Sequence, residues 1–337
     1  MAVIDSAVYL DGARVSDGHA PADAVREARE RGGMVWIGLR STDAEELGEL
    51  QKLLDLHPLA VKDCLRGHQR SKFERFGPMG FLVVQPARYV DETEEVIFTE
   101  VDFFVGADFI VTVQNEDQID VHAVQRDLER HPGILEKGPY GIVWALLSNV
   151  LDGYGPVIDG VENDVDEIEE QLFSQAKEVS RRIFGLQREV IDLQHATYPL
   201  VDIFDRLQTM VADETDGREA PAFRELDDRA GHIVDRVDAF RHTLDSALTV
   251  HASLVEQENN EAMRSMTETG LQQNEQVKKV SGWAAVLFAP TLIGTIYGMN
   301  FDDMPELHWR FGYPLALLAM LATSVTLYLI FKRRGWL

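Results

Sequence analysis

The chain has 337 residues and a formal net charge of −25, from 57 acidic and 32 basic side chains. So acidic a chain is not expected to bind nucleic acid, because the phosphates would repel it. The charge fits either a solvated surface or the attraction of divalent cations. The single cysteine, Cys64, excludes a disulfide within the chain.

Residues 1–137 predict a mixed α/β domain. Helical patterns cover 22–31, 43–56 and 119–131, and apolar strand patterns cover 35–39, 81–89, 96–105 and 108–114. Gly106, Ala107 and Asp108 separate the last two strands, which predicts a hairpin there. We therefore expect a compact domain of sheet and helices.

From residue 138 onward the strand patterns disappear. Two long helices are expected at 141–174 and 176–211, followed by a break that ends at Pro221. No proline follows until Pro290, so one helix, roughly 110 Å long, is expected to run from about residue 222 into the apolar region. A helix of this length needs neighbours for stability. We assign residues 138–279 to a helical stalk.

Two segments near the end of the chain, 280–298 and 312–331, contain no charged side chain. Each would be about 30 Å long as a helix, enough to cross a bilayer core, and the loop 299–311 makes them a hairpin. Basic side chains flank the pair at Lys278, Lys279, Lys332, Arg333 and Arg334, the last three in the tail 332–337. The positive-inside rule then predicts a multi-pass protein of the plasma (inner) membrane, with both termini in the cytoplasm.

A stripe of mostly small or hydroxyl-bearing residues follows the long helix into the first span. Its members, spaced alternately four and three apart, are Gly270, Asn274, Val277, Ser281, Ala284, Phe288, Thr291, Thr295 and Gly298. This period of 3.5 predicts a left-handed helical bundle. The stripe fits close helix packing, for which Gly294-x-x-x-Gly298 is a common motif. From the spacing alone packing is favoured, and the alternative is an axial channel with Val277 and Phe288 as apolar constrictions.

The end of the first span also carries a motif. It comprises Tyr297-Gly298-Met299-Asn300-Phe301, Met304-Pro305-Glu306-Leu307 and Gly312-Tyr313-Pro314. This segment, with the order of domain, long helix, two spans and basic tail, resembles the CorA family of magnesium transport proteins. The resemblance implies a funnel-shaped homopentamer whose first span lines the pore while the second packs outside. It implies Mg²⁺ as cargo, with Co²⁺ and Ni²⁺ as further candidates.

The resemblance also implies a pore entrance at Asn300, framed by the backbone of Gly298 and Met299. An amide oxygen suits Mg²⁺, which keeps its hydration water and prefers oxygen ligands. As an alternative, Asn300 serves only as a helix C-cap. Acidic side chains in the outer loop would concentrate cations electrostatically; these are Asp302, Asp303 and Glu306.

Relatives in this family carry regulatory Mg²⁺ sites between subunits, and bound ions there favour closure. The resemblance maps one sensor carboxylate onto Asp63 and the other side of the site onto Glu225 and Asp228. Two departures stand out: Lys62 where relatives often have an acid, and Glu225 where aspartate is usual. As an alternative, Asp227 and Asp228 merely favour the start of their helix electrostatically.

Other chemistries lack a place in the sequence. It contains no P-loop or G-x-G-x-x-G fingerprint and no defensible nucleophile arrangement, so neither an enzyme nor an ATP-driven pump is expected. Two alternatives remain: a Zn²⁺, Co²⁺ or Ni²⁺ transporter of the same fold, and a non-transporting membrane-anchored scaffold. The stripe has no imidazole or thiolate, which disfavours the first. The second predicts a stripe that tolerates bulky substitutions.

Overall fold

The computed structural model describes residues 3–17, 20–40, 44–114, 120–172, 179–299, 304–305 and 309–337. The chain divides into two compact units, Met1–His251 and Ala252–Leu337. Helix α8, Ala220–Tyr297, contributes residues to both units. The prediction of one helix running into the first apolar segment is therefore confirmed.

The first unit is built on a seven-stranded sheet with the order β2-β1-β3-β9-β8-β5-β4, and a separate ribbon pairs β6 with β7. Among the described strands, β3 and β9 pair in parallel and the other neighbouring strands pair antiparallel. The strands are β1 Val3–Leu10, β2 Ala13–Asp17, β3 Met34–Arg40, β4 Lys72–Phe76, β5 Met79–Val84, β6 Ala87–Val90, β7 Glu95–Phe98, β8 Val101–Val105 and β9 Phe109–Gln114. The predicted hairpin of β8 and β9 is confirmed.

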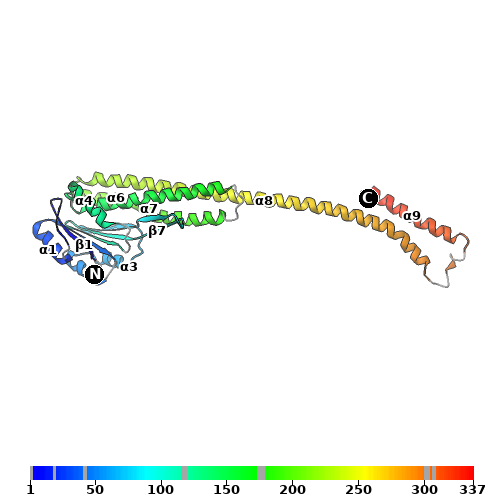
Figure 1. Ribbon diagram of the computed structural model, residues 1–337, viewed down its shortest axis with the longest axis horizontal. Coiled ribbons are helices and arrows are strands. Elements are labelled where there is room, and N and C mark those ends of the chain that lie inside the picture. Colours follow the sequence, from blue (N-terminus) through cyan, green and yellow to red (C-terminus); the bar gives the residue numbers. More distant parts are fainter. Residues whose placement is uncertain are drawn as a thin grey trace. The chain divides into compact units, whose positions relative to one another are not determined.

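Helices cover both faces of this sheet (Figure 1). Three short helices pack on one face, and the long helices pack on the other. The helices are α1 Pro21–Arg31, α2 Ala44–Leu54, α3 Pro58–Arg66, α4 Val121–Arg130, α5 Pro132–Leu135, α6 Pro139–Gln171, α7 Val179–Glu214, α8 Ala220–Tyr297 and α9 Gly312–Arg333. Neighbouring strand residues serve opposite cores: Phe104 faces α1–α3, and Phe103 faces the long helices.

Two expected strands are each broken in the structure. The pattern 81–89 is divided between β5 and β6 at Pro86, and the pattern 96–105 is divided between β7 and β8. Pro86 has no N–H to donate to a central strand, so the chain leaves the main sheet there. The Thr99 N–H donates to the Pro86 carbonyl at 3.0 Å, which sets the two breaks opposite each other.

The first half of α8 is held by a continuous apolar stripe. Its buried members are Phe223, Leu226, Ala230, Val237, Phe240, Leu244 and Ala247. They recur at the period of a packed helix pair and join the core formed with α6 and α7. Beyond His251 this stripe ends, and most of the following residues of α8 are exposed.

Among the described residues, three helices are long and apolar enough to cross a membrane: α6, α8 and α9. In the most apolar 18-residue stretch of α6, 56% is buried within the protein. In the corresponding stretches of α8 and α9, 6% is buried. The apolar side chains of α6 are therefore already used in a protein core. The stretches of α8 and α9 are the two that need lipid or other chains.

In the second unit α8 and α9 pack against each other. Val286 of α8 is buried, and the Trp283 ring lies 6.2 Å from the Tyr328 ring of α9. Pro290 has no N–H for the Val286 carbonyl, which would be its helical partner. The Ser324 hydroxyl of α9 donates to that carbonyl at 3.4 Å instead. A polar contact thus joins the two apolar helices where proline interrupts the backbone ladder.

Candidate functional site

The predicted stripe on α8 lies on the face turned away from α9. All nine of its members, from Gly270 to Gly298, are exposed in the single chain. By contrast, Gly282 and Val286, which lie off the stripe, are buried against the end of the chain and α9. Gly294 also turns toward α9, since a Cβ there would lie 3.4 Å from Met320. Packing against α9 therefore does not explain the small residues of the stripe.

The threonines of the stripe present oxygen acceptors. The Thr291 hydroxyl donates to the Phe288 carbonyl at 2.6 Å, and the Thr295 hydroxyl donates to the Thr291 carbonyl at 2.7 Å. With the proton directed into the helix backbone, the lone pairs of each hydroxyl remain available on the exposed face. Water bound to a Mg²⁺ ion donates hydrogen bonds, so such acceptors suit a hydrated cation.

The motif that is predicted to form the pore entrance lies at the end of α8. The Gly298 N–H donates to the Gly294 carbonyl at 2.9 Å, and Met299 follows as an exposed residue just past the helix end. The remaining predicted entrance and loop residues lie outside the described part of the chain; they are Asn300, Asp302, Asp303 and Glu306.

Asp63, the first predicted sensor residue, already has a cationic partner. It lies on α3, and its Oδ2 is 2.5 Å from Lys72 Nζ on β4. Both side chains are about a quarter exposed. Burial acts to lower the pKa of Lys72, but the hydrogen bonds and charges of Asp63 and Glu74 outweigh it and the pKa is raised. A metal ion at Asp63 has to compete with this ammonium group.

Sequence reasoning missed two carboxyl groups next to this pair, Glu100 and Asp102. Burial raises the pKa of Asp102 to about 7, and the neighbouring charge of Glu100 adds to the effect, although a hydrogen bond with the Cys64 thiol opposes it. Asp102 is 2% exposed, and its Oδ1 has no hydrogen-bond partner in the described residues. The signal for Asp102 in the sequence was the position of an acidic residue inside the apolar strand pattern 96–105.

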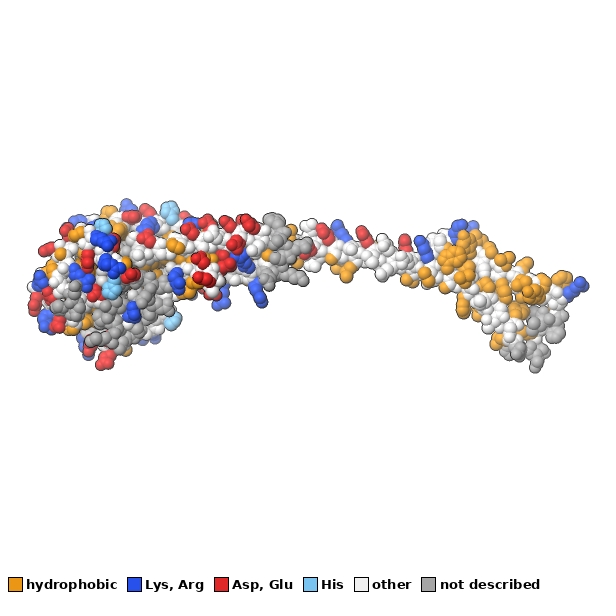
Figure 2. Space-filling view, viewed as in Figure 1, with side chains coloured by type: hydrophobic (Ala, Val, Ile, Leu, Met, Phe, Trp, Pro, Cys, Tyr) orange, Lys and Arg blue, Asp and Glu red, His pale blue; other side chains and the backbone are white. Residues whose placement is uncertain are grey.

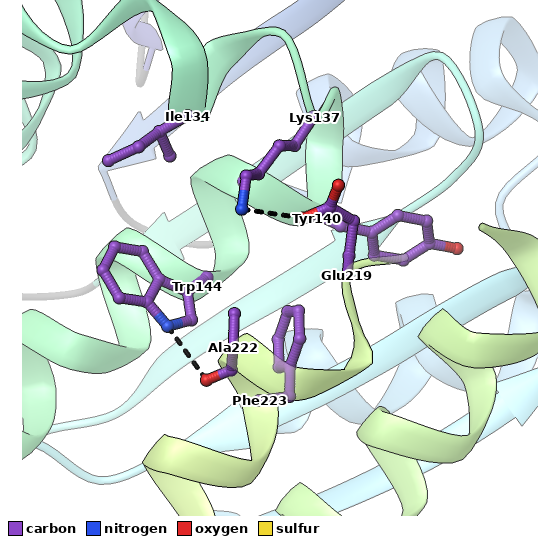
Figure 3. Close-up of a pocket in the computed structure, with 8 residues that line it drawn as sticks. Ile134, Lys137, Tyr140, Trp144, Glu219, Ala222 and Phe223 are labelled. Carbon is purple, nitrogen blue, oxygen red and sulfur yellow. Dashed lines mark hydrogen bonds and ion pairs between the residues drawn. The ribbon is translucent and has the colours of Figure 1, made fainter. Parts of the chain in front are cut away.

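The other predicted sensor residues, Glu225 and Asp228, are exposed on the first turns of α8. The start of this helix is fixed on α6 and on the turn before α6, as Figure 3 shows. Lys137, just before α6, pairs with Glu219, just before α8, at 2.8 Å, and the Trp144 indole of α6 donates to the Ala222 carbonyl at 3.1 Å. The cavity between them has a volume of about 100 Å³, which is smaller than a typical small-molecule site.

Asp227, between the two predicted residues, is in an unfavourable environment for its charge. Burial raises its pKa, and the nearby charges of Asp228 and of Asp205 on α7 raise it further. Its Oδ1 is buried and has no hydrogen-bond partner among the described residues. The structure does not bring this group to Asp63: within the described residues, no three His, Cys, Asp or Glu side chains of one chain are arranged to hold a metal ion.

The sequence matches the model of a known family, CorA-like Mg²⁺ transporter protein, over residues 31–333. The chain belongs to this family. Relatives include the cobalt/magnesium transport protein CorA of Thermotoga maritima, 28% identical over 94% of this chain and 87% of that protein. The magnesium transport protein CorA of Escherichia coli K12 is 32% identical over 52% of this chain and 56% of its own length.

Solved structures share the fold of this CorA-family chain. The CorA magnesium transporter of Methanocaldococcus jannaschii aligns with a TM-score of 0.54 at 18% identity, over 90% of this chain and 92% of that chain. The full-length CmaX protein aligns with a TM-score of 0.62 at 16% identity, over 99% and 98%. These likenesses confirm the predicted class: an α/β domain followed by long helices and a C-terminal apolar helix.

Proposed function

We propose that this chain forms a channel for the uptake of Mg²⁺ down its electrochemical gradient. The observation that carries the proposal is the stripe on α8, which is exposed on the face that α9 leaves open. A stripe of mostly small and hydroxyl-bearing residues allows copies of α8 to approach one another closely. The family suggests five copies arranged as a funnel around one axis.

In this assembly the chain has six functional parts. Residues 1–137 form the cytoplasmic α/β domain and 138–279 the stalk. Residues 280–298 line the pore, 299–311 form the entrance with Asn300, 312–331 pack outside, and 332–337 lie at the inner surface. A membrane potential of 100 mV, negative inside, favours entry of a divalent ion by about 4.6 kcal/mol, so no other energy source is needed.

Regulation follows from the carboxylates of the first unit. We place a Mg²⁺ sensor between copies, with Asp63 on one and Glu225 and Asp228 on the next. The repulsion among Asp205, Asp227 and Asp228 supports a cation there, because a bound ion would relieve it. High internal Mg²⁺ then ties the subunits together in the closed state.

The test is Mg²⁺ entry into proteoliposomes under an imposed potential, negative inside, with no pH gradient. We expect Ala284→Phe, on the stripe, and Asn300→Ala, at the entrance, each to reduce entry by at least about tenfold. Leu287→Phe is the matched control, because Leu287 is exposed one turn away but off the stripe. If Ala284→Phe conducts like the wild type, the stripe does not line the pore. Zn²⁺ entry that needs a pH gradient, without Mg²⁺ entry, would favour a transition-metal transporter.

A further inference from the structure

One end of the α8–α9 hairpin carries five basic side chains. They are Lys278 and Lys279 on α8 and Lys332, Arg333 and Arg334 at the end of α9, all exposed. The sequence has no acidic side chain between Glu275 and Asp302, and none after Glu306. Within the described residues none of the five cations has an ion-pair partner. The patch therefore has a strong positive charge.

Contacts between the two helices bring these cations into one neighbourhood. A Cβ at Gly282, one turn after Lys278, would lie 3.4 Å from the Leu337 side chain and 3.5 Å from the Trp336 carbonyl oxygen. On α9, Lys332 Nζ lies 5.5 Å from the centre of the Tyr328 ring, which is itself 6.2 Å from Trp283. The residues that follow α9 thus fold back onto α8 next to its two lysines.

The cations lie at the boundary between polar and apolar surface. Figure 2 shows basic side chains where the apolar surface of the hairpin begins. Trp283 is 50% exposed, and Trp336, stacked on Phe331 at 5.5 Å, is 38% exposed. Indole rings with this exposure are typical of the headgroup level of a membrane. Exposed apolar residues such as Leu287 and Leu329 continue from there along the same two helices.

We propose that this basic end of the hairpin is a binding site for the headgroups of anionic phospholipids. The phosphodiester oxygen atoms accept hydrogen bonds from the lysine and arginine side chains, and the acyl chains lie on the exposed apolar side chains beside them. Charge complementarity selects an anionic over a zwitterionic headgroup. The position at the polar–apolar boundary selects a lipid over a soluble anion. The site does not depend on ion transport.

The test uses the purified full-length chain in phosphatidylcholine vesicles that contain a trace of spin-labelled lipid. We expect spin-labelled phosphatidylglycerol to associate with the wild-type protein at least about fivefold more strongly than spin-labelled phosphatidylcholine. The preference should decrease with added NaCl, because the charges are exposed. Label is present in both leaflets, so the result does not depend on the orientation of the protein.

Two variants on different helices locate the site. We expect Lys332→Gln/Arg333→Gln and Lys278→Gln/Lys279→Gln each to reduce the preference at least about threefold. Arg310→Gln is the matched control: Arg310 lies between Trp309 and Phe311 at the opposite end of the hairpin, and its removal should leave the preference unchanged. Far-UV circular dichroism establishes that each variant is folded.

Several outcomes would overturn the proposal. Equal association of the two lipids with the wild-type protein would do so, and is expected if the cations instead meet carboxylates of another protein. An equal loss of the preference in Arg310→Gln would show that the preference depends on the overall charge of the protein and not on this site. Displacement of phosphatidylglycerol by millimolar inorganic phosphate would assign the site to a soluble anion. These lipid-binding results can be interpreted even if the transport test fails, because the lipid site does not depend on transport.

Discussion

The two units of the chain differ in what covers their apolar side chains. In the first unit, Phe204 of α7 is 1% exposed and lies in a core of strands and helices from the same chain. In the second unit, Phe288 of α8 and Leu318 of α9 are 69% and 66% exposed. A single chain buries the apolar side chains of the first unit but leaves those of the second unit exposed. Contacts from outside this chain have to cover these side chains, as a bilayer and the proposed assembly would.

The largest expected effect tests this contrast with one substitution in each unit. Phe204→Ala should reduce the free energy of unfolding of the first unit by about 3–5 kcal/mol, because it leaves a cavity in a closed core. Phe288→Ala should change the free energy of unfolding of the second unit by less than about 0.5 kcal/mol. Urea unfolding of the full-length protein in detergent, followed by circular dichroism, measures both. Equal losses would show that the second unit also depends on a core of its own.

A second prediction concerns the buried Asp102. Its pKa is raised from 3.8 to about 7, so between these values the folded state binds more protons than the unfolded state. The contribution of this group to the free energy of unfolding therefore decreases by up to roughly 4 kcal/mol as the pH rises from about 4 to 7. Above about pH 7 the contribution stays at this lower value. Asp102→Asn should remove this decrease and stabilise the protein at pH 8 relative to the wild type.

Urea unfolding at pH 5 and pH 8 measures the effect of Asp102→Asn. Asp166→Asn, at an exposed position of α6, serves as the control and should keep the wild-type pH dependence. A pH dependence in Asp102→Asn equal to that of the wild type would show that the carboxyl of Asp102 is ionised in the folded protein.

The smallest expected effect concerns Lys72, which neutralises Asp63 in the first unit. If Asp63 and a neighbouring copy bind Mg²⁺ together, Lys72→Gln removes the cation that competes with Mg²⁺ for Asp63. Partly exposed ion pairs contribute about 0.2–1 kcal/mol, so the internal Mg²⁺ concentration for half closure should fall by at most about fivefold. Flux into proteoliposomes preloaded with increasing Mg²⁺ measures it. Arg75→Gln, which breaks the pairs with Asp213 and Glu214, should leave closure unchanged.

The sequence predicted the second unit better than the first. Absence of charge over 280–298 and 312–331 is a local property, and both segments are helical. In the first unit, β1, β2, β4 and α3 were not predicted, because their short patterns gain stability only from the sheet they join. Pro86 was the available signal for the break between β5 and β6.

The residues of the candidate site could also be predicted only in part from the sequence. The 3.5-residue spacing defined the stripe, but spacing alone does not say which face of α8 the second span covers. That required the contacts of Gly282, Val286 and Gly294 in the folded hairpin. The partner of Asp63 was unpredictable for another reason. Lys72 is nine residues away on a strand, and only the packing of α3 beside that strand brings it close.

The hydrogen bond from Ser324 to the Val286 carbonyl has a consequence for biosynthesis. In a hydrocarbon environment a carbonyl released by proline would otherwise stay without a donor, which is costly. Here the donor belongs to the same chain and is made only thirty-eight residues later. We therefore expect each newly synthesised chain to close its own hairpin on insertion, before it meets another copy. Assembly then joins finished hairpins, and the stripe of one chain stays free for its neighbours.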